Sequence, residues 1–168
     1  MTSTVAPQST IKPSLEGRTD RLPVITYGTL RRGQHNYGRF LAGSTVRETV
    51  VTVLGMEMHG LTGFPYVFEA DSPESTIVAE LVELEESSYE STVRGLDFLE
   101  GYKGPDATRN HYDRIVVTVN DGEKDVEAYI YVGNPEIKES VEALEMRIAD
   151  GDWVAHSTRR FRQFGSHA

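Results

Sequence analysis

The chain has 168 residues, of which 38% are hydrophobic and 26% charged, and this composition is typical of a single globular domain. The absence of cysteine excludes disulfide scaffolds, thiolate metal centres and cysteine nucleophiles. The net charge of −9 is concentrated in residues 48–150, which argues against a nucleic-acid-binding face on the body of the protein.

No apolar run approaches the roughly 18 residues that a membrane span requires. Residues 1–22 are polar and lack the apolar segment of a secretory signal, so we expect a flexible leader on a cytoplasmic protein without a membrane partner. Two basic clusters, at residues 31–32 and 159–162, are interpreted as solvated surface charge.

The folded domain is expected to occupy residues 23–153. Its first strand is predicted at residues 24–27, a β-branched and aromatic run that ends at Gly28. Further strands are predicted at residues 49–54, 66–70 and 76–84. Residues 55–60 alternate apolar and polar side chains, and we expect them to continue the preceding strand around a bulge.

A helix is predicted from Ser87 or Ser88 to Leu99, because apolar residues recur there at helical spacing, and Gly101 is expected to end it. Two more strands are predicted at residues 113–120 and 126–132, joined by an Asp-Gly turn.

Pro135 is expected to open a second helix, an insert over about residues 136–150 that Gly151 ends. Its apolar stripe consists of Ile137, Val141, Leu144 and Ile148. Residues 154–168 are expected to form a basic C-terminal tail. The order of elements predicts an α+β fold with a small mixed, mostly antiparallel β-barrel-like sheet flanked by helices.

Common catalytic signatures, such as the phosphate-binding loop and the zinc-protease helix, are missing, and the histidines show no metal-ligand spacing. We therefore predict neither a metal nor a cofactor. One segment that stands out is residues 27–36, where a strand enters a turn at Gly28. Glycine would let main-chain N–H groups approach a carboxylate or an oxyanion, although a plain structural turn would have the same sequence.

The second segment is residues 96–102, in which Glu100 lies at the predicted C-terminal end of a helix. A carboxylate there meets the negative end of the helix dipole, which costs roughly 0.3–1 kcal/mol, so its presence suggests a functional role. A solvated carboxylate at a helix end is the alternative. Asp97, one turn earlier, is expected to orient the loop rather than to take part in chemistry.

Taken together, these segments resemble the γ-glutamylcyclotransferase-like family. The resemblance rests on the Tyr-Gly-Thr-Leu run at 27–30, the Leu-Asp-Phe-Leu-Glu-Gly-Tyr run at 96–102 and the Tyr-Asp-Arg run at 112–114. Shorter likenesses lie at residues 63–65, 128–132 and 151–153, so the resemblance spans residues 24–153.

The resemblance implies the family's β-barrel-like fold and an intramolecular reaction that needs no metal or cofactor. The α-amine of a γ-glutamyl group attacks its own γ-carbonyl, giving 5-oxoproline and a free amine or amino acid. Glu100 would be the catalytic proton shuttle, with a pKa raised above the ordinary value of about 4.3. Substrate contacts would come from Tyr27, Gly28, Thr29, Leu30, Tyr112 and Tyr131.

The implied partner is a small-molecule γ-glutamyl compound, and no nucleic-acid or membrane partner is expected. The resemblance leaves the leaving group open, and no oligomeric state is predicted. A second hypothesis also stays open, in which the same pocket binds or sequesters an anionic small molecule without turnover.

Overall fold

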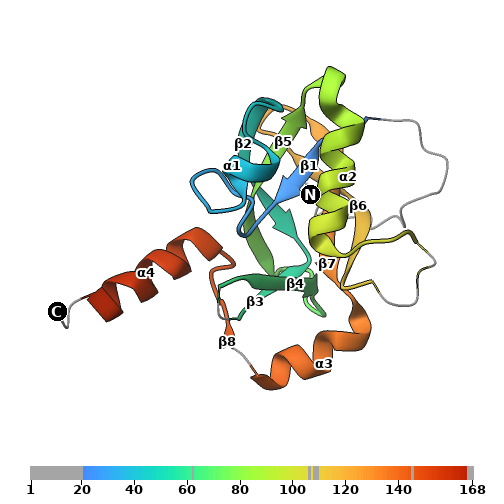
Figure 1. Ribbon diagram of the computed structural model, residues 1–168. Coiled ribbons are helices and arrows are strands. Elements are labelled where there is room, and N and C mark those ends of the chain that lie inside the picture. The colour runs from blue at the N-terminus through green and yellow to red at the C-terminus, as the bar shows by residue number, and fades with distance from the viewer. Residues whose placement is uncertain (1–20, 62, 106, 108–109, 145, 166–168) are drawn as a thin grey trace, which may run out of the picture.

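A short buried strand, β1 (Val24–Thr26), lies at the centre of the principal sheet of the computed structural model (Figure 1). The structure describes residues 21–61, 63–105, 107, 110–144 and 146–165, and the side chains only to residue 160 and not at 142–146. The other strands of this sheet are β2 (Thr45–Leu54), β5 (Thr76–Leu84), β6 (Tyr112–Asn120) and β7 (Asp125–Gly133). All of β1 is buried because both of its faces are covered, as its unbroken apolar pattern predicts.

The strands follow the order β2-β5-β1-β7-β6, and only the β1–β7 pair is parallel. The outer strands β2 and β6 also contact each other, which curls the sheet toward a barrel. This architecture confirms the predicted α+β class and its mostly antiparallel, barrel-like sheet.

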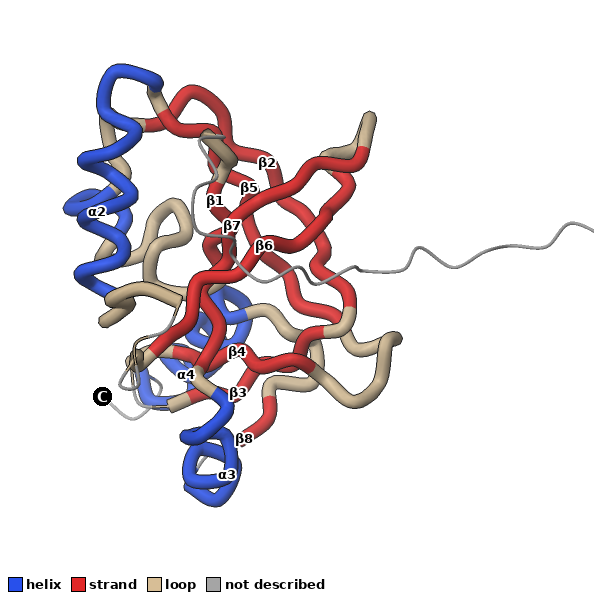
Figure 2. The backbone as a smooth tube through the Cα atoms, turned by 90° about the vertical axis from the view of Figure 1, so that its right-hand side faces the viewer, coloured by secondary structure: helices blue, strands red, loops and turns tan. Residues whose placement is uncertain are grey.

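A smaller sheet packs below the principal one and consists of β4 (Pro65–Glu69), β3 (Met56–Gly60) and β8 (Met146–Arg147) (Figure 2). The prediction that residues 55–60 continue the preceding strand is wrong. Gly55 has a φ of +72° and turns the chain out of β2, and β3 then pairs with β4 and β8. The positive φ at a glycine permits this change of sheet.

Helix α2 (Tyr89–Glu100) covers one face of the principal sheet, after a short 3-10 turn, η1 (Glu86–Ser88) (Figure 2). As predicted, the helix ends at Gly101, whose φ of +66° gives the left-handed cap. The remaining helices are α1 (Tyr37–Phe40), α3 (Pro135–Leu144) and α4 (Trp153–Gly165).

The C-terminal region differs from the predicted helical insert and tail. Helix α3 ends at Leu144, and the chain then forms β8, so Ile148 is not part of the helix stripe. Val141 packs in the core beside α2, whereas Ile148 packs in the separate core between the sheets. Residues 154–165, expected as a tail, belong to α4, and 166–168 lie outside the described residues.

Residues 1–20 of the expected leader also lie outside the described residues. Arg21 donates a 2.7 Å hydrogen bond to the Glu86 carbonyl, and the Leu22 carbonyl accepts one of 2.7 Å from the Tyr89 hydroxyl. The last two residues of the expected leader, Arg21 and Leu22, therefore contact the start of α2 and the turn before it.

Gly151 anchors the segment between β8 and α4 against β5. Its carbonyl accepts a 2.9 Å hydrogen bond from the Val78 N–H, and its φ is +62°. A Cβ at this position would lie 2.3 Å from the Thr76 carbonyl oxygen and 2.8 Å from the Ile77 Cα, both main-chain atoms.

Replacing Gly151 with alanine should therefore destabilise the protein by about 2–4 kcal/mol, through the clash and the left-handed φ. Gly38→Ala is the matched control, because a Cβ at Gly38 meets nothing within 4 Å and its φ is ordinary. Its effect should stay within about 0.5 kcal/mol. Urea denaturation of both variants measures the difference, and equal stabilities would contradict this account of Gly151.

Candidate functional site

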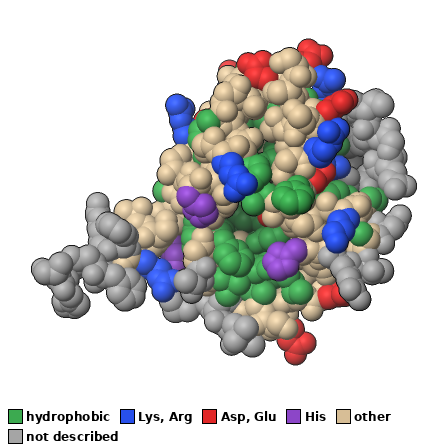
Figure 3. Space-filling model, viewed as in Figure 1, with side chains coloured by type: hydrophobic (Ala, Val, Ile, Leu, Met, Phe, Trp, Pro, Cys, Tyr) green, Lys and Arg blue, Asp and Glu red, His purple; other side chains and the backbone are tan. Residues whose placement is uncertain are grey.

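A cavity of about 450 Å³ lies where β1 ends, between the last turn of α2, strands β6 and β7, and the loop before β4. It opens on the face in Figure 3, where hydrophobic side chains cover much of the hollow and histidines lie beside it. The candidates Tyr27, Gly28, Thr29, Leu30, Glu100, Tyr112 and Tyr131 all line this one cavity. The fold thus brings together residues that are as far apart in sequence as Tyr27 and Tyr131, which are separated by 104 positions.

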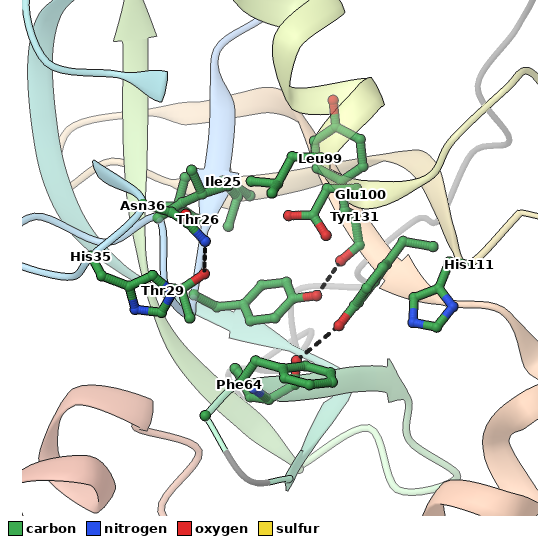
Figure 4. Close-up of a pocket in the computed structure, with 16 residues that line it drawn as sticks. Ile25, Thr26, Thr29, His35, Asn36, Phe64, Leu99, Glu100, His111 and Tyr131 are labelled. Carbon is green, nitrogen blue, oxygen red and sulfur yellow. Dashed lines mark hydrogen bonds between the residues drawn. The ribbon is translucent and has the colours of Figure 1, made fainter. Parts of the chain in front are cut away.

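The loop that follows β1 is closed by its own hydrogen bonds. The Arg31 N–H donates to the Gly28 carbonyl at 3.0 Å, and the Asn36 N–H donates to the Thr29 carbonyl at 3.0 Å. The Asn36 side-chain amide also donates to Thr29 Oγ1 at 2.9 Å, as Figure 4 shows. Among the described residues, none accepts a hydrogen bond from the main-chain N–H of Thr29 or Leu30. Two donors at the cavity are therefore available to a ligand.

Gly28 is required by close packing and not by an unusual φ. A Cβ there would lie 2.8 Å from Cγ and 2.9 Å from Cδ of Pro65, while the φ of Gly28 is not positive. Gly28 thus lets the loop pack against the start of β4, and Pro65 also lines the cavity.

Arg31, interpreted from sequence as solvated charge, is only 8% exposed. Its Nη1 lies 2.9 Å from Asp152 Oδ1 and its Nε lies 3.4 Å from Glu80 Oε2. Arg32 fits the sequence interpretation better, with an exposed side chain. The ion pairs of Arg31 with Glu80 and Asp152 attach the loop after β1 to β5 and to the residue before α4. Both carboxylates are too distant from Arg31 in sequence for these pairs to be predicted.

Glu100 is the last residue of α2, and its carboxylate points into the cavity (Figure 4). Burial raises its pKa from 4.5 to about 7. Among the described residues, no side chain forms a hydrogen bond or an ion pair with this carboxylate, so no cation offsets the loss of hydration. The group can therefore accept and return a proton near neutral pH.

The three tyrosines that line the cavity each donate their hydroxyl proton to another part of the protein. Tyr27 donates to the Tyr131 carbonyl at 2.5 Å, and Tyr112 donates to the Pro65 carbonyl at 3.1 Å. The hydroxyl of Tyr131 donates to Asp97 Oδ1 at 2.6 Å. Burial raises the pKa of all three, which keeps them protonated. A hydroxyl has one proton, so Tyr112 in this arrangement offers a ligand only its oxygen lone pair.

Sequence reasoning missed several residues that also line the cavity, namely His35, Phe64, Pro65, Leu99 and His111. Pro65 and Phe64 belong to a segment that the resemblance did point out, at residues 63–65. His111 lies next to Tyr112, and its Nε2 shares a hydrogen bond with the Tyr66 hydroxyl. His35 and Leu99 lie within the segments singled out at residues 27–36 and 96–102, whereas no local pattern marks His111.

Within the described part of the chain, no group of three or more metal-ligating side chains could hold a metal ion. The helices of the described residues include none that is both long and apolar enough to span a bilayer.

Comparison with known proteins identifies relatives of this chain. A protein-family model described as gamma-glutamyl cyclotransferase, AIG2-like, matches residues 24–155. A curated protein of Niallia circulans, gamma-L-glutamyl-butirosin B gamma-glutamyl cyclotransferase, is 31% identical over 136 residues. That alignment covers 81% of this chain and 79% of the relative.

Solved structures share the fold at low sequence identity. An uncharacterized protein of Pyrococcus horikoshii has a TM-score of 0.57 at 18% identity, over 88% of this chain and 99% of that one. A protein of Arabidopsis thaliana has a TM-score of 0.53 at 17% identity, over 98% of this chain and 85% of that one. At these identities the likeness shows the fold alone.

Neutralising Glu100 should change the pH dependence of stability. Its folded pKa, about 7, exceeds the ordinary value of 4.5, so the folded state holds a proton that the unfolded state loses between these values. Wild-type stability at this site therefore falls as pH rises through that window. As the pH rises from about 4.5 to 7, the melting temperature of Glu100→Gln should increase relative to that of wild type. At higher pH the gap between the two melting temperatures should stay constant. A gap that does not vary with pH would contradict the raised pKa.

Gly28→Ala should disturb both the fold and the cavity, because the new Cβ must displace the Pro65 ring. We expect a stability loss of about 1–3 kcal/mol, measured by urea denaturation, together with weaker binding of a γ-glutamyl ligand by calorimetric titration. Unchanged affinity in the folded variant would show that this loop does not contact ligand.

Proposed function

Because the chain belongs to the γ-glutamyl cyclotransferase, AIG2-like family and is an enzyme of that kind, we propose that it cyclises a γ-glutamyl compound to 5-oxoproline. The other product is the free amine or amino acid. The observation that carries this proposal is the partly buried Glu100 carboxyl, whose pKa of about 7 suits proton exchange with an amine.

In the proposed reaction, Glu100 takes a proton from the substrate α-ammonium, which frees the nitrogen lone pair. The amine then attacks the γ-carbonyl carbon, a ring C–N bond forms, and the carbonyl electrons move to oxygen. Collapse of this intermediate breaks the bond to the departing nitrogen. The α-nitrogen gives up two protons as the ring closes, and the departing nitrogen gains two and leaves as an ammonium ion. Glu100 relays these protons, so the charge balances and water does not attack.

Main-chain donors would stabilise the negative charge that develops. The N–H groups of Thr29 and Leu30 donate to no described residue, and both residues line the cavity that holds Glu100. Fixed main-chain donors of this kind stabilise an oxyanion by a few kcal/mol without reorganising. They would hold either the oxyanion or the α-carboxylate of the γ-glutamyl group.

The tyrosine hydroxyls would orient the amine. Tyr27 and Tyr112 donate their protons to main-chain carbonyls, so each presents an oxygen lone pair to a ligand. A lone pair accepts a hydrogen bond from an ammonium group but cannot donate to a carboxylate. This polarity supports a pose in which the α-ammonium lies beside Glu100 and the tyrosines, and the carboxylate lies toward residues 29–30.

The relative from Niallia circulans acts, by its name, on gamma-L-glutamyl-butirosin B. For this chain we propose recognition of the γ-glutamyl head group, which is the part that all such substrates share. Retention of a carboxylate in the cavity favours turnover over binding alone, because a site that only binds an anion gains nothing from a second negative group.

The test is release of 5-oxoproline from γ-glutamyl amino acids, γ-glutamyl-lysine isopeptide and γ-glutamyl alkylamines, measured by chromatography. Glu100→Gln should lower kcat by about 10²-fold or more on any compound that wild type cleaves, because the amide cannot relay a proton. The rate of wild type should rise with pH through about 7, where Glu100 becomes a base.

Glu90→Gln is the matched control, an exposed glutamate in the first turn of the same helix, and it should retain the wild-type rate. A Glu100→Gln variant that keeps more than about a tenth of the rate would remove Glu100 from the mechanism. If wild type binds these compounds but releases no 5-oxoproline, the binding hypothesis replaces the enzyme.

A further inference from the structure

Three side chains behind the cavity form a hydrogen-bonded cluster that joins the end of α2 to β6 and β7. Asp97 lies one helical turn before Glu100, and Arg114 Nη1 donates to its two carboxylate oxygens at 2.8 and 2.7 Å. The Tyr131 hydroxyl donates to the same carboxylate at 2.6 Å. We call Asp97, Arg114 and Tyr131 the anchoring cluster. None of its side-chain polar groups is needed for the chemistry proposed above.

Tyr131 connects the two halves of the site. Its hydroxyl donates a hydrogen bond to Asp97 on the helix that carries Glu100. Its main-chain carbonyl accepts the 2.5 Å hydrogen bond from Tyr27, at the start of the loop that follows β1 (Figure 4). A change in the position of Tyr131 would therefore alter the separation of the carboxylate and the loop.

Arg114 holds the helix end on both sides of Glu100. Before Glu100 it pairs with Asp97, and after it the ring of Tyr102 lies 5.0 Å from the Arg114 guanidinium carbon. The Tyr102 N–H also donates to the Asp97 carbonyl at 2.9 Å, which closes the helix cap. The ring of Tyr129 covers the guanidinium at 4.8 Å. Glu100 is thus bracketed by two residues that contact one fixed cation.

We propose that the anchoring cluster positions Glu100, holding the last turn of α2 against β7 so that the carboxylate stays inside the cavity and at a set distance from the loop at residues 28–30. This inference rests on the proposed function for its kinetic consequence, although the geometry itself does not depend on turnover. Asp97, Arg114 and Tyr131 are positioning residues, because their side-chain hydrogen bonds are with one another and none of them is with Glu100.

The helix end needs such an anchor. Phe98, in the same turn, is 87% exposed, so one side of this turn meets solvent and gains no packing there. Helix ends fray readily when only local bonds hold them. Burial is the cause of the raised pKa of Glu100, so an outward shift of the turn would rehydrate the carboxylate and lower that pKa.

Several other ionisable side chains face the cavity that holds Glu100. Tyr27 faces it from the residue after β1, and Tyr66 and Tyr112 face it from β4 and β6; burial raises the pKa of all three. His35 and His111 also line the cavity, and the exposed His111 contacts Tyr66. A His111→Gln background removes the imidazole that contacts Tyr66 from the comparison.

The test is Tyr131→Phe, which removes one hydroxyl and keeps the ring and the main-chain carbonyl. We expect the Glu100 pKa, followed by NMR of isotope-labelled glutamate carboxyls and assigned with Glu100→Gln, to fall by about one unit. The acidic limb of the kcat profile should move to lower pH by the same amount. We expect kcat to fall by about tenfold, with KM changed by less than about threefold.

Tyr129→Phe is the matched control. Tyr129 lies two residues earlier on the same strand, is equally buried, and covers Arg114 with a ring face that phenylalanine retains. This control should leave both the Glu100 titration and kcat within about twofold of wild type. Asp97→Asn supplies a second variant, since it breaks the ion pair with Arg114 and keeps the side-chain shape. It should shift the Glu100 titration in the same direction as Tyr131→Phe.

Each result bears on one proposal. An unchanged Glu100 titration in both folded variants overturns the positioning role, and so does a fall in kcat without any shift of the titration. If wild type releases no 5-oxoproline, the proposed function fails, but the NMR titration of Glu100 still decides whether the cluster positions it. If Tyr131→Phe does not fold, the Asp97→Asn titration decides the inference.

Discussion

The burial of one carboxylate at a helix end, without a cation beside it among the described residues, is the constraint on which the rest of the site depends. Water would normally solvate Glu100, and nothing described in the cavity replaces that hydration. The protein holds the group there by attaching its helix on either side, through Asp97 and Tyr102. The cost appears as a raised pKa, which brings the protonation equilibrium of the group close to neutral pH.

The same constraint explains how the surrounding polar groups are used. A tyrosine hydroxyl buried without a partner would add a further desolvation cost, and here Tyr27 and Tyr112 both donate to main-chain carbonyls. These bonds orient the oxygen lone pairs and leave the carboxylate without a competing donor. The main-chain donors of residues 29–30 are left for a ligand, because Asn36 and Arg31 use other groups to close their loop. The cavity is therefore lined by hydroxyl oxygens that can accept hydrogen bonds and by main-chain N–H groups that can donate them.

Connections between distant segments keep this arrangement rigid. Arg31 joins the loop to β5 and to the start of α4, whereas Tyr131 joins the loop to α2. Both residues work through bonds to elements that are far away in sequence. Through these attachments the loop and the helix are each bonded to strands of the sheet and not merely to one another. Sites that depend on proton transfer need this precision, since the donor and acceptor must stay within hydrogen-bond reach.

Local pattern was sufficient for most of the elements. The alternation at 76–84, the hairpin around 121–122 and the helix end at Gly101 follow from side-chain period, turn chemistry and the left-handed conformation that glycine allows, and all three are confirmed. The order of short motifs also indicated the family and the residues that line the cavity. Features that depend on partners distant in sequence were decided by the tertiary structure. They are the placement of β3 in a second sheet, the separation of Ile148 from α3, the burial of Arg31 and the acceptor to which each tyrosine hydroxyl donates. A sequence determines which groups a segment carries and how that segment prefers to fold, but the free energy of a buried charge or hydroxyl depends on what packs around it, and only the folded chain specifies that.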